Sequence, residues 1–442
     1  MTTPTVPHGT LFRFATAGSV DDGKSTLVGR LLHDSKAILA DTLDAVARTS
    51  ADRGFGGEAG GLDLALLTDG LRAEREQGIT IDVAYRYFAT DKRTFILADC
   101  PGHVQYTKNT VTGASTADAV VLLVDARHGV LEQTRRHLSV AALLRVPHVV
   151  VAVNKIDLIG YAQDRFAEIS GAIEAIAAEL GLESVASIPV SALEGDNVVH
   201  RSEHTPWYAG PTLVQILETL PGLDAAEAAE HATEAGGSLR FPVQYVIRPQ
   251  GALAAGLDEE EYRDYRGYAG QLASGHVGVG DTVSIIAPGQ GRRTTTVAGI
   301  DTADGPLQRA IAPASVTLRL AEDIDIARGD LIASGFLPTS TDAFTARLAW
   351  LGAHALRPGA RVLIKHGAAT VKGLVTAING RLDLDSLEIG EAETLELNDI
   401  GEVGLKLAAP LPLEPYAAHR RTGAFLVIDP QDGNTLAAGL VA

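Results

Sequence analysis

The chain has one cysteine, Cys100, so it can form no internal disulfide and no zinc site built from several cysteines. No apolar run approaches the length of a membrane span, and the first residues lack the basic and apolar regions of a signal peptide. Lys and Arg total 37 against 55 Asp and Glu, a net charge of −18 that argues against broad nonspecific binding to nucleic acid. We therefore expect a cytoplasmic protein outside any membrane.

What the chain does contain is a candidate phosphate-binding loop, GSVDDGKST, with the spacing Gly-x4-Gly-Lys-Ser. The apolar run LFRFATA precedes it, and apolar residues at helical spacing follow it. A strand that leads through a glycine loop into a helix points backbone N–H groups and the helix dipole at one spot, which suits phosphate. The alternative is an ordinary glycine-rich turn between strand and helix.

Each part of this loop has an expected role in binding a nucleoside triphosphate. Lys24 should reach the β- and γ-phosphates, and the Ser25 hydroxyl should ligate Mg²⁺. The residues expected to contact the nucleotide are Gly18, Ser19, Val20, Asp21, Asp22, Gly23, Lys24, Ser25 and Thr26.

A second motif, NKID at Asn154 to Asp157, follows a buried apolar run and indicates which base is bound. The Asp157 carboxylate can accept hydrogen bonds from N1–H and the 2-amino group of guanine, whereas adenine offers neither donor. The Lys155 stem can pack along the base, and Ser191, Ala192 and Leu193 can complete the pocket. Alone, the tetrapeptide could equally be a helix cap. After the phosphate loop, it predicts a GTP site.

Two further segments are positioned to sense the γ-phosphate. Asp99, at the end of TFILAD, can hold Mg²⁺ through water, and the Gly102 N–H can reach the γ-phosphate. Thr80 can close on Mg²⁺ and the terminal phosphate, and His103 can orient the attacking water. In isolation Thr80 would be an ordinary strand-edge threonine and His103 a solvated loop histidine. We expect Cys100 to pack beneath this loop, and His366 to be structural or on the surface.

The order of strands and helices predicts three domains. Alternation over residues 10–222 predicts an α/β P-loop GTPase domain with a doubly wound, mostly parallel sheet. Residues 223–238 are acidic and small and are interpreted as a linker. Short β-rich runs then predict two β-barrel domains, over residues 239–337 and 342–442.

The motifs GSVDDGKST, EQGIT, DCPGH, NKID and SAL, in this order, resemble the translation-factor class of GTPases typified by elongation factor Tu. Longer stretches, including DCPGHVQYTKNTVTGASTADAVVLLVDAR and RFPVQYVIRP, are similar to the sulfate adenylyltransferase subunit 1 family. Asp22 stands where elongation factor Tu has histidine, which favours that family. The resemblance implies GTP and Mg²⁺ as cofactors and a catalytic sulfate adenylyltransferase subunit as partner, in a heterodimer or higher heteromer.

The family resemblance further implies that GTP hydrolysis drives formation of adenylyl sulfate and pyrophosphate from ATP and sulfate on that partner. The sequence has one phosphate loop, so the ATP chemistry is expected on another polypeptide and a fused adenylyl-sulfate kinase is not expected. Two rivals stay open at this point: a factor that delivers aminoacyl-tRNA to the ribosome, and a nucleotide-dependent scaffold with negligible turnover.

Overall fold

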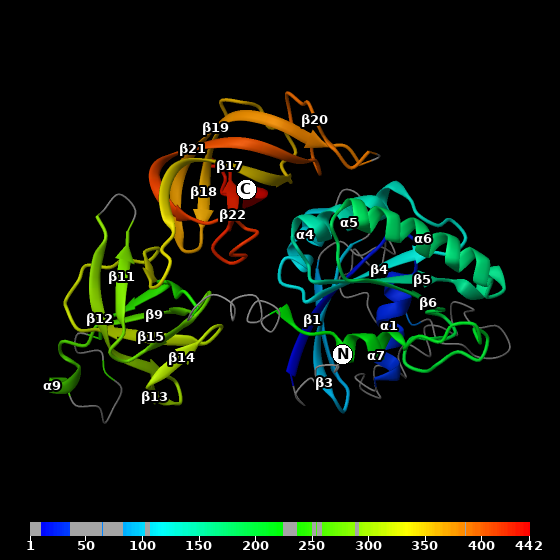
Figure 1. Ribbon diagram of the computed structural model, residues 1–442, viewed down its shortest axis with the longest axis horizontal. Coiled ribbons are helices and arrows are strands. Elements are labelled where there is room, and N and C mark those ends of the chain that lie inside the picture. Colours follow the sequence, from blue (N-terminus) through cyan, green and yellow to red (C-terminus); the bar gives the residue numbers. More distant parts are fainter. Residues whose placement is uncertain are drawn as a thin grey trace. The chain divides into compact units, whose positions relative to one another are not determined.

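The computed structural model describes residues 10–35, 64, 83–101, 107–223, 237–249, 253, 259–287, 291–384 and 386–442. The chain divides into two compact units, residues 1–226 with 383–388 and residues 227–382 with 389–442 (Figure 1). The glycine-rich stretch near residue 55 and most of the expected linker lie outside the described residues. The domain boundaries expected from composition therefore stay a prediction.

The first unit is built on a six-stranded sheet with the order β2-β3-β1-β4-β5-β6. Its strands are β1 (Thr10–Ala17), β2 (Ala84–Ala89), β3 (Arg93–Asp99), β4 (Ala119–Asp125), β5 (His148–Asn154) and β6 (Val185–Pro189). Only β2, at one edge, is antiparallel to its neighbour. This arrangement confirms the predicted doubly wound, mostly parallel sheet.

Helices cover both faces of this sheet, so its central strands are buried on both sides (Figure 1). All seven residues of β4 are buried, as its uninterrupted apolar sequence predicts. In Figure 1 the helices α4, α5 and α6 lie on one side and α1 and α7 on the other. Their bounds are α1 (Lys24–Asp34), α4 (Thr107–Ala114), α5 (Glu132–Leu143), α6 (Gln163–Glu179) and α7 (Leu213–Thr219), with a short 3₁₀ helix, η4, at Ile156–Ile159.

Local sequence sets where these helices begin and end. The Thr212 hydroxyl accepts a hydrogen bond from the Gln215 N–H, and the Gln215 Oε1 accepts one from the Thr212 N–H. This pair of bonds is a capping box that starts α7. Gly181 ends α6 with φ of 69°, a left-handed conformation that glycine adopts without steric cost. In the edge strand β2, Tyr85 and Tyr87 lie together on the exposed face, while Phe88 enters the core.

The second unit begins with an eight-stranded sheet of short strands, ordered β7-β16-β11-β12-β15-β9-β8 with β13 paired to β12. Strands β7 and β8 stand at opposite ends of this order but are consecutive in the chain. Because the link between them is short, the two ends of the sheet must lie close together, and the sheet curls. The strands are β7 (Arg240–Pro242), β8 (Tyr245–Ile247), β9 (Gly267–Gln271), β11 (Thr282–Ile286), β12 (Arg293–Thr302), β13 (Gly305–Leu307), β15 (Ser315–Leu320) and β16 (Leu331–Ala333), with the pair β10 (His276–Gly278) and β14 (Arg309–Ile311) and the one-turn helix α9 (Glu259–Tyr262).

The remaining strands of this unit close into a ring. Strands β18, β22, β23, β17, β21 and β19 pair in that order, and β18 pairs with β19 to complete a six-stranded barrel that leaves no open edge. The bounds are β17 (Thr339–Trp350), β18 (Arg361–His366), β19 (Ala369–Leu382), β20 (Ile389–Gly390), β21 (Ile400–Leu413), β22 (Ala424–Ile428) and β23 (Thr435–Val441). The two β-rich domains after the α/β domain confirm the predicted fold class, a P-loop GTPase domain followed by β-barrels.

A buried ion pair joins the two β-rich domains within the second unit. The Arg240 guanidinium on β7 donates to both carboxylate oxygens of Glu414, and its shortest contact is 2.7 Å. The Thr422 hydroxyl also donates to Glu414, at 2.7 Å. Burial raises the pKa of Glu414, but the bonds from Arg240 and Thr422 outweigh it and leave the pKa lowered. His366 lies nearby, its Nε2 2.7 Å from the Thr422 carbonyl, which suits a structural role.

Arg240→Ala is expected to destabilise the second unit by about 3–5 kcal/mol, because it leaves the Glu414 carboxylate buried without its counter-charge. Denaturant unfolding followed by circular dichroism measures this. Lys406→Ala removes an exposed pair with Asp342 and is the matched control, with little expected change. Since folding lowers the pKa of Glu414, the stabilisation is present above the ordinary glutamate range and is lost as the pH falls through the folded value. Equal unfolding midpoints for both variants would contradict the assignment.

Candidate nucleotide-binding site

The phosphate loop joins β1 to α1 at the carboxyl edge of the sheet. Strand β1 lies between β3 and β4, so the chain crosses from one side of β1 to the other at this point. Its turn needs residues with positive φ: Asp21 has φ of 65° and Gly23 has φ of 91°. A Cβ added at Gly23 would lie 2.4 Å from Asn154 Nδ2, so this position has room for glycine alone. The predicted strand–loop–helix context of the motif is thus present.

Lys24, the first residue of α1, points back into the loop. Its Nζ donates to the carbonyl oxygens of Gly18 and Ser19, at 2.8 Å each, and the side chain is buried. Burial lowers the pKa of Lys24, although the carboxylates of Asp22 and Asp99 oppose the shift. The loop therefore holds an ammonium group in place before any phosphate arrives.

Asn154, at the end of β5, ties the phosphate loop to the base-side loop. Its Nδ2 donates to the Asp22 carbonyl at 2.7 Å, and its Oδ1 accepts the Ala192 N–H at 2.9 Å. Arg30 of α1 also donates to the carbonyls of Ala192 and Leu193. Segments that are 132 and 38 residues from Asn154 are thereby held by one amide side chain.

Asp157 lies in η4 with an acceptor left open. Its Oδ1 is buried and has no hydrogen-bond partner among the described residues, although such atoms are normally paired. Guanine N1–H and its 2-amino group are donors that this oxygen would need, whereas adenine has none at that edge. The orphaned oxygen therefore fits guanine. The flanking loop is fixed by its own turn, in which the Ser191 hydroxyl accepts the Glu194 N–H.

The residues expected to hold Mg²⁺ are described only in part. Asp99 ends β3, and its Oδ1 accepts the hydroxyl of Thr16, its register partner on β1, at 3.0 Å. Ser25 is the second residue of α1 and is half-buried. A carboxylate and a hydroxyl oxygen suit Mg²⁺, which prefers oxygen ligands and keeps several waters. Thr80, Gly102 and His103 lie outside the described residues, so their roles stay predictions.

Cys100 follows Asp99 and is fully buried, as expected. A Cβ added at Gly113 would lie 2.4 Å from its Sγ, so α4 packs directly against the thiol. Burial raises the pKa of Cys100 far above its usual range, which keeps the thiol protonated.

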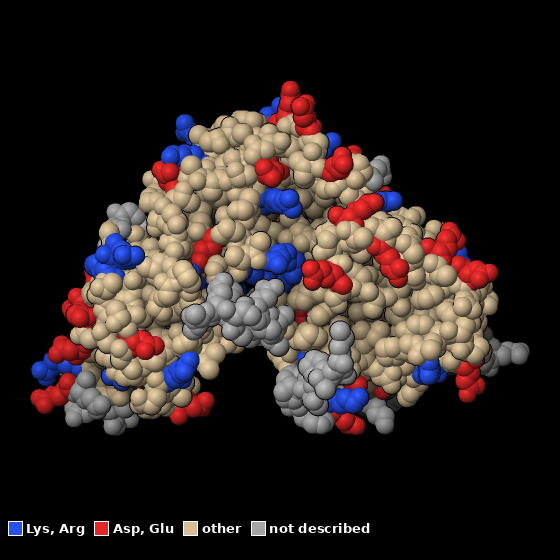
Figure 2. Space-filling model, in the orientation of Figure 1, with Lys and Arg blue, Asp and Glu red and all other residues tan. Residues whose placement is uncertain are grey.

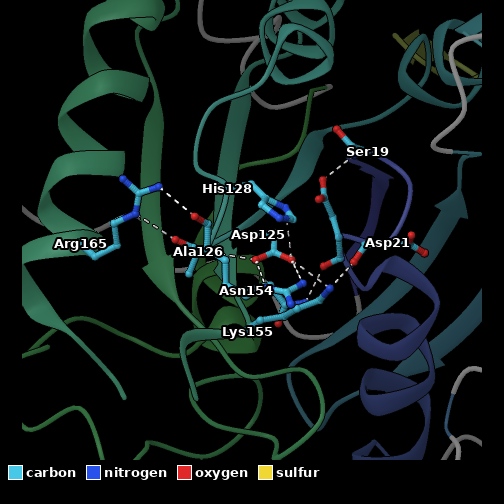
Figure 3. A network of polar contacts seen from close by, with 10 residues as sticks. Ser19, Asp21, Asp125, Ala126, His128, Asn154, Lys155 and Arg165 are labelled. Carbon is cyan, nitrogen blue, oxygen red and sulfur yellow. Dashed lines mark hydrogen bonds and ion pairs between the residues drawn. The ribbon is translucent and has the colours of Figure 1, made fainter. Parts of the chain in front are cut away.

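A cluster of charged residues beside the base motif was not predicted. Asp125 ends β4 and pairs in register with Asn154, and it accepts hydrogen bonds from Arg127 at 2.6 and 3.0 Å (Figure 3). The Lys155 Nζ lies 3.0 Å from Asp125 and also donates to the Asp21 carbonyl. Burial raises the pKa of Asp125, but the bonds from Arg127 and Lys155 outweigh it and lower the pKa well below its usual range.

This cluster holds the Lys155 side chain against the phosphate loop at Asp21 (Figure 3). Lys155 has φ of 60°, so its backbone turns sharply after β5 and its side chain returns over the phosphate loop. Asp125 could have been found from the sequence, because it follows a buried strand just as Asp99 and Asn154 do. Arg127 carries no such signal.

Known protein families and solved structures agree with the fold and the site described above. The family model "Elongation factor Tu GTP binding domain" matches residues 10–225, and "GTP-eEF1A C-terminal domain-like" matches residues 343–442. The GTPase-like domain of S. cerevisiae Ski7, bound to GDP and inorganic phosphate, has a TM-score of 0.51 at 17% identity and covers 98% of each chain, a likeness of fold. Fold and motifs together define a GTPase of the translation-factor class.

Curated relatives narrow this class to one family. The "Bifunctional enzyme CysN/CysC" of Mycobacterium tuberculosis is 50% identical over 98% of this chain and 67% of its own length. "Sulfate adenylyltransferase subunit 1" of Colwellia psychrerythraea is 47% identical over 98% of this chain and 87% of its own. The chain belongs to the sulfate adenylyltransferase subunit 1 family. Within the part that the structure describes, no helix is long and apolar enough to cross a membrane.

Asp157→Asn is expected to weaken GTP by at least about tenfold and to strengthen xanthosine triphosphate, because it reverses the hydrogen-bond pattern at the purine 2-position. Equilibrium titration with both nucleotides measures the exchange of preference. An unchanged GTP affinity would remove Asp157 from the base pocket.

Asp125→Ala and Lys155→Ala are each expected to speed GDP release several-fold. Lys155→Ala removes the side chain that donates to the Asp21 carbonyl in the phosphate loop, and Asp125→Ala removes the carboxylate that holds that side chain in place. Since the two residues act as a pair, the double variant should release GDP about as fast as either single variant, so that it falls short of the sum by about one single effect. Stopped-flow release of a fluorescent GDP analogue measures all four proteins, with Glu132→Ala, which removes an exposed carboxylate from α5, as the charge control. Additive effects would show that Asp125 does not act through Lys155.

Proposed function

We propose that this chain is the GTP-hydrolysing subunit of a sulfate adenylyltransferase and couples GTP hydrolysis to adenylyl sulfate formation on a separate catalytic subunit. The observation that supports this most directly is the 46–50% identity to relatives of that family over 98% of the chain. The site described above supplies the chemistry, since it offers a phosphate loop and an open acceptor for guanine.

In the proposed hydrolysis, the chain's own groups position the triphosphate and the water. Lys24 and the loop N–H groups neutralise the β- and γ-phosphates, and Asp157 holds the base. Ser25, Asp99 and Thr80 would hold Mg²⁺, which supplies charge neutralisation on the transferred phosphoryl group. His103 orients the attacking water, and the Gly102 N–H contacts the γ-phosphate.

The adenylyl transfer itself is assigned to the partner subunit. Forming adenylyl sulfate and pyrophosphate from ATP and sulfate requires a second nucleotide site, and the sequence holds one phosphate loop, already used for GTP. Delivery of aminoacyl-tRNA is the second candidate, and the net charge of −18 argues against broad nonspecific binding to nucleic acid. On the face drawn in Figure 2, Asp and Glu are interspersed with Lys and Arg.

Reconstitution with a catalytic subunit tests the proposal. The chain alone should bind GTP, hydrolyse it slowly and make no adenylyl sulfate. With the catalytic subunit, ATP and sulfate, GTP should raise the product beyond the level reached without it, and a non-hydrolysable analogue should not sustain that level. His103→Ala should keep GTP affinity while single-turnover hydrolysis slows by about 10²-fold or more.

Three outcomes would contradict the proposal. Adenylyl sulfate formed by this chain alone would place the ATP site here. Product levels indifferent to GTP would remove the coupling. GTPase activity stimulated by ribosomes and unaffected by the catalytic subunit would favour the translation-factor role.

A further inference from the structure

Asp22 places a carboxylate inside the phosphate loop. The residue immediately precedes Gly23 and Lys24, yet its side chain is only 4% exposed. Its Oδ2 accepts the Ser19 N–H at 2.6 Å. The side chain thus folds back within the loop and takes one of the loop's own backbone donors.

No described cation neutralises this carboxylate directly. The Lys24 Nζ donates to the carbonyl oxygens of Gly18 and Ser19, and the Lys155 Nζ is paired with Asp125. Burial raises the pKa of Asp22, and neither the Ser19 hydrogen bond nor the charges of Lys24 and Lys155 cancel that rise. The surrounding groups therefore compensate the charge of this carboxylate only in part.

A bound nucleotide would bring further negative charge to the same loop. The phosphates are held by the N–H groups around Gly23 and by Lys24, within a few residues of the Asp22 carboxylate. At an effective dielectric constant of about 20, like charges held within one loop repel strongly enough to change a dissociation constant by roughly tenfold or more. The asparagine or serine that would satisfy the Ser19 N–H without charge would avoid this repulsion.

We propose that the Asp22 carboxylate limits the affinity of this site for guanine nucleotides and thereby speeds the release of GDP. This inference rests on the proposed function, because it concerns the same GTP site. The carboxylate serves two purposes at once: its hydrogen bond to Ser19 keeps the empty loop in shape, and its charge opposes the phosphates.

Asp22→Asn removes the charge and keeps an oxygen that can accept the Ser19 N–H. The variant is expected to bind GDP about tenfold more tightly or better, with a correspondingly slower release. Guanosine, which has no phosphate, should compete equally well against wild type and variant. If the affinity rises for GDP but not for guanosine, the change acts through charge, because a change in loop structure would not be expected to act on the charged ligand alone.

Asp22→Ser is a second neutral variant that also offers an acceptor, and it keeps the test valid if the first folds poorly. Asp164→Asn removes an exposed carboxylate from the first turn of α6 and should leave GDP release unchanged. Equal or weaker GDP binding in the folded neutral variants, or an equal gain for guanosine, would overturn the inference. A wild-type chain that binds no guanine nucleotide would instead refute the proposed function.

Discussion

The two hydrogen bonds of the Asn154 amide hold the nucleotide site together. One amide side chain satisfies the Asp22 carbonyl in the phosphate loop and the Ala192 N–H in the base-side loop, so the positions of the two loops are not independent. The geometry also forbids a side chain at Gly23, because the Asn154 amide occupies the space that a Cβ would fill. Glycine in this motif is thus fixed by a residue more than a hundred positions away as well as by its own backbone conformation.

The parts of the site that the sequence predicted are those built from contiguous residues. The loop between β1 and α1, the buried strand β4 and the end of α6 at Gly181 follow from local pattern, because periodicity and glycine conformation are properties of neighbouring residues. Asp99 and Asn154 were placed by the rule that ligands gather at the carboxyl ends of parallel strands. The roles assigned to Thr80, Gly102 and His103 stay predictions, since these residues lie outside the described part of the chain.

What the sequence did not reveal depends on pairing between distant segments. The Asp125 cluster exists because the β4–β5 register sets Asp125 beside Asn154 and so brings Lys155 within 3.0 Å of it. Arg240 and Glu414 are 174 residues apart and meet only when two β-rich domains pack together. Alternation along β2 sets Tyr85 and Tyr87 on the same face of the strand, but which face meets solvent is decided by the neighbouring elements, not by the strand.

The burial of Cys100 has a practical consequence. The only thiol of the chain is packed against α4 and held protonated, so reagents that attack thiolates should spare it in the folded protein. A cysteine introduced on any exposed strand would then be the single labelled position, with the native residue left in place. Pairs of such labels, one on each compact unit, would report the distance between the units as nucleotide is added and removed.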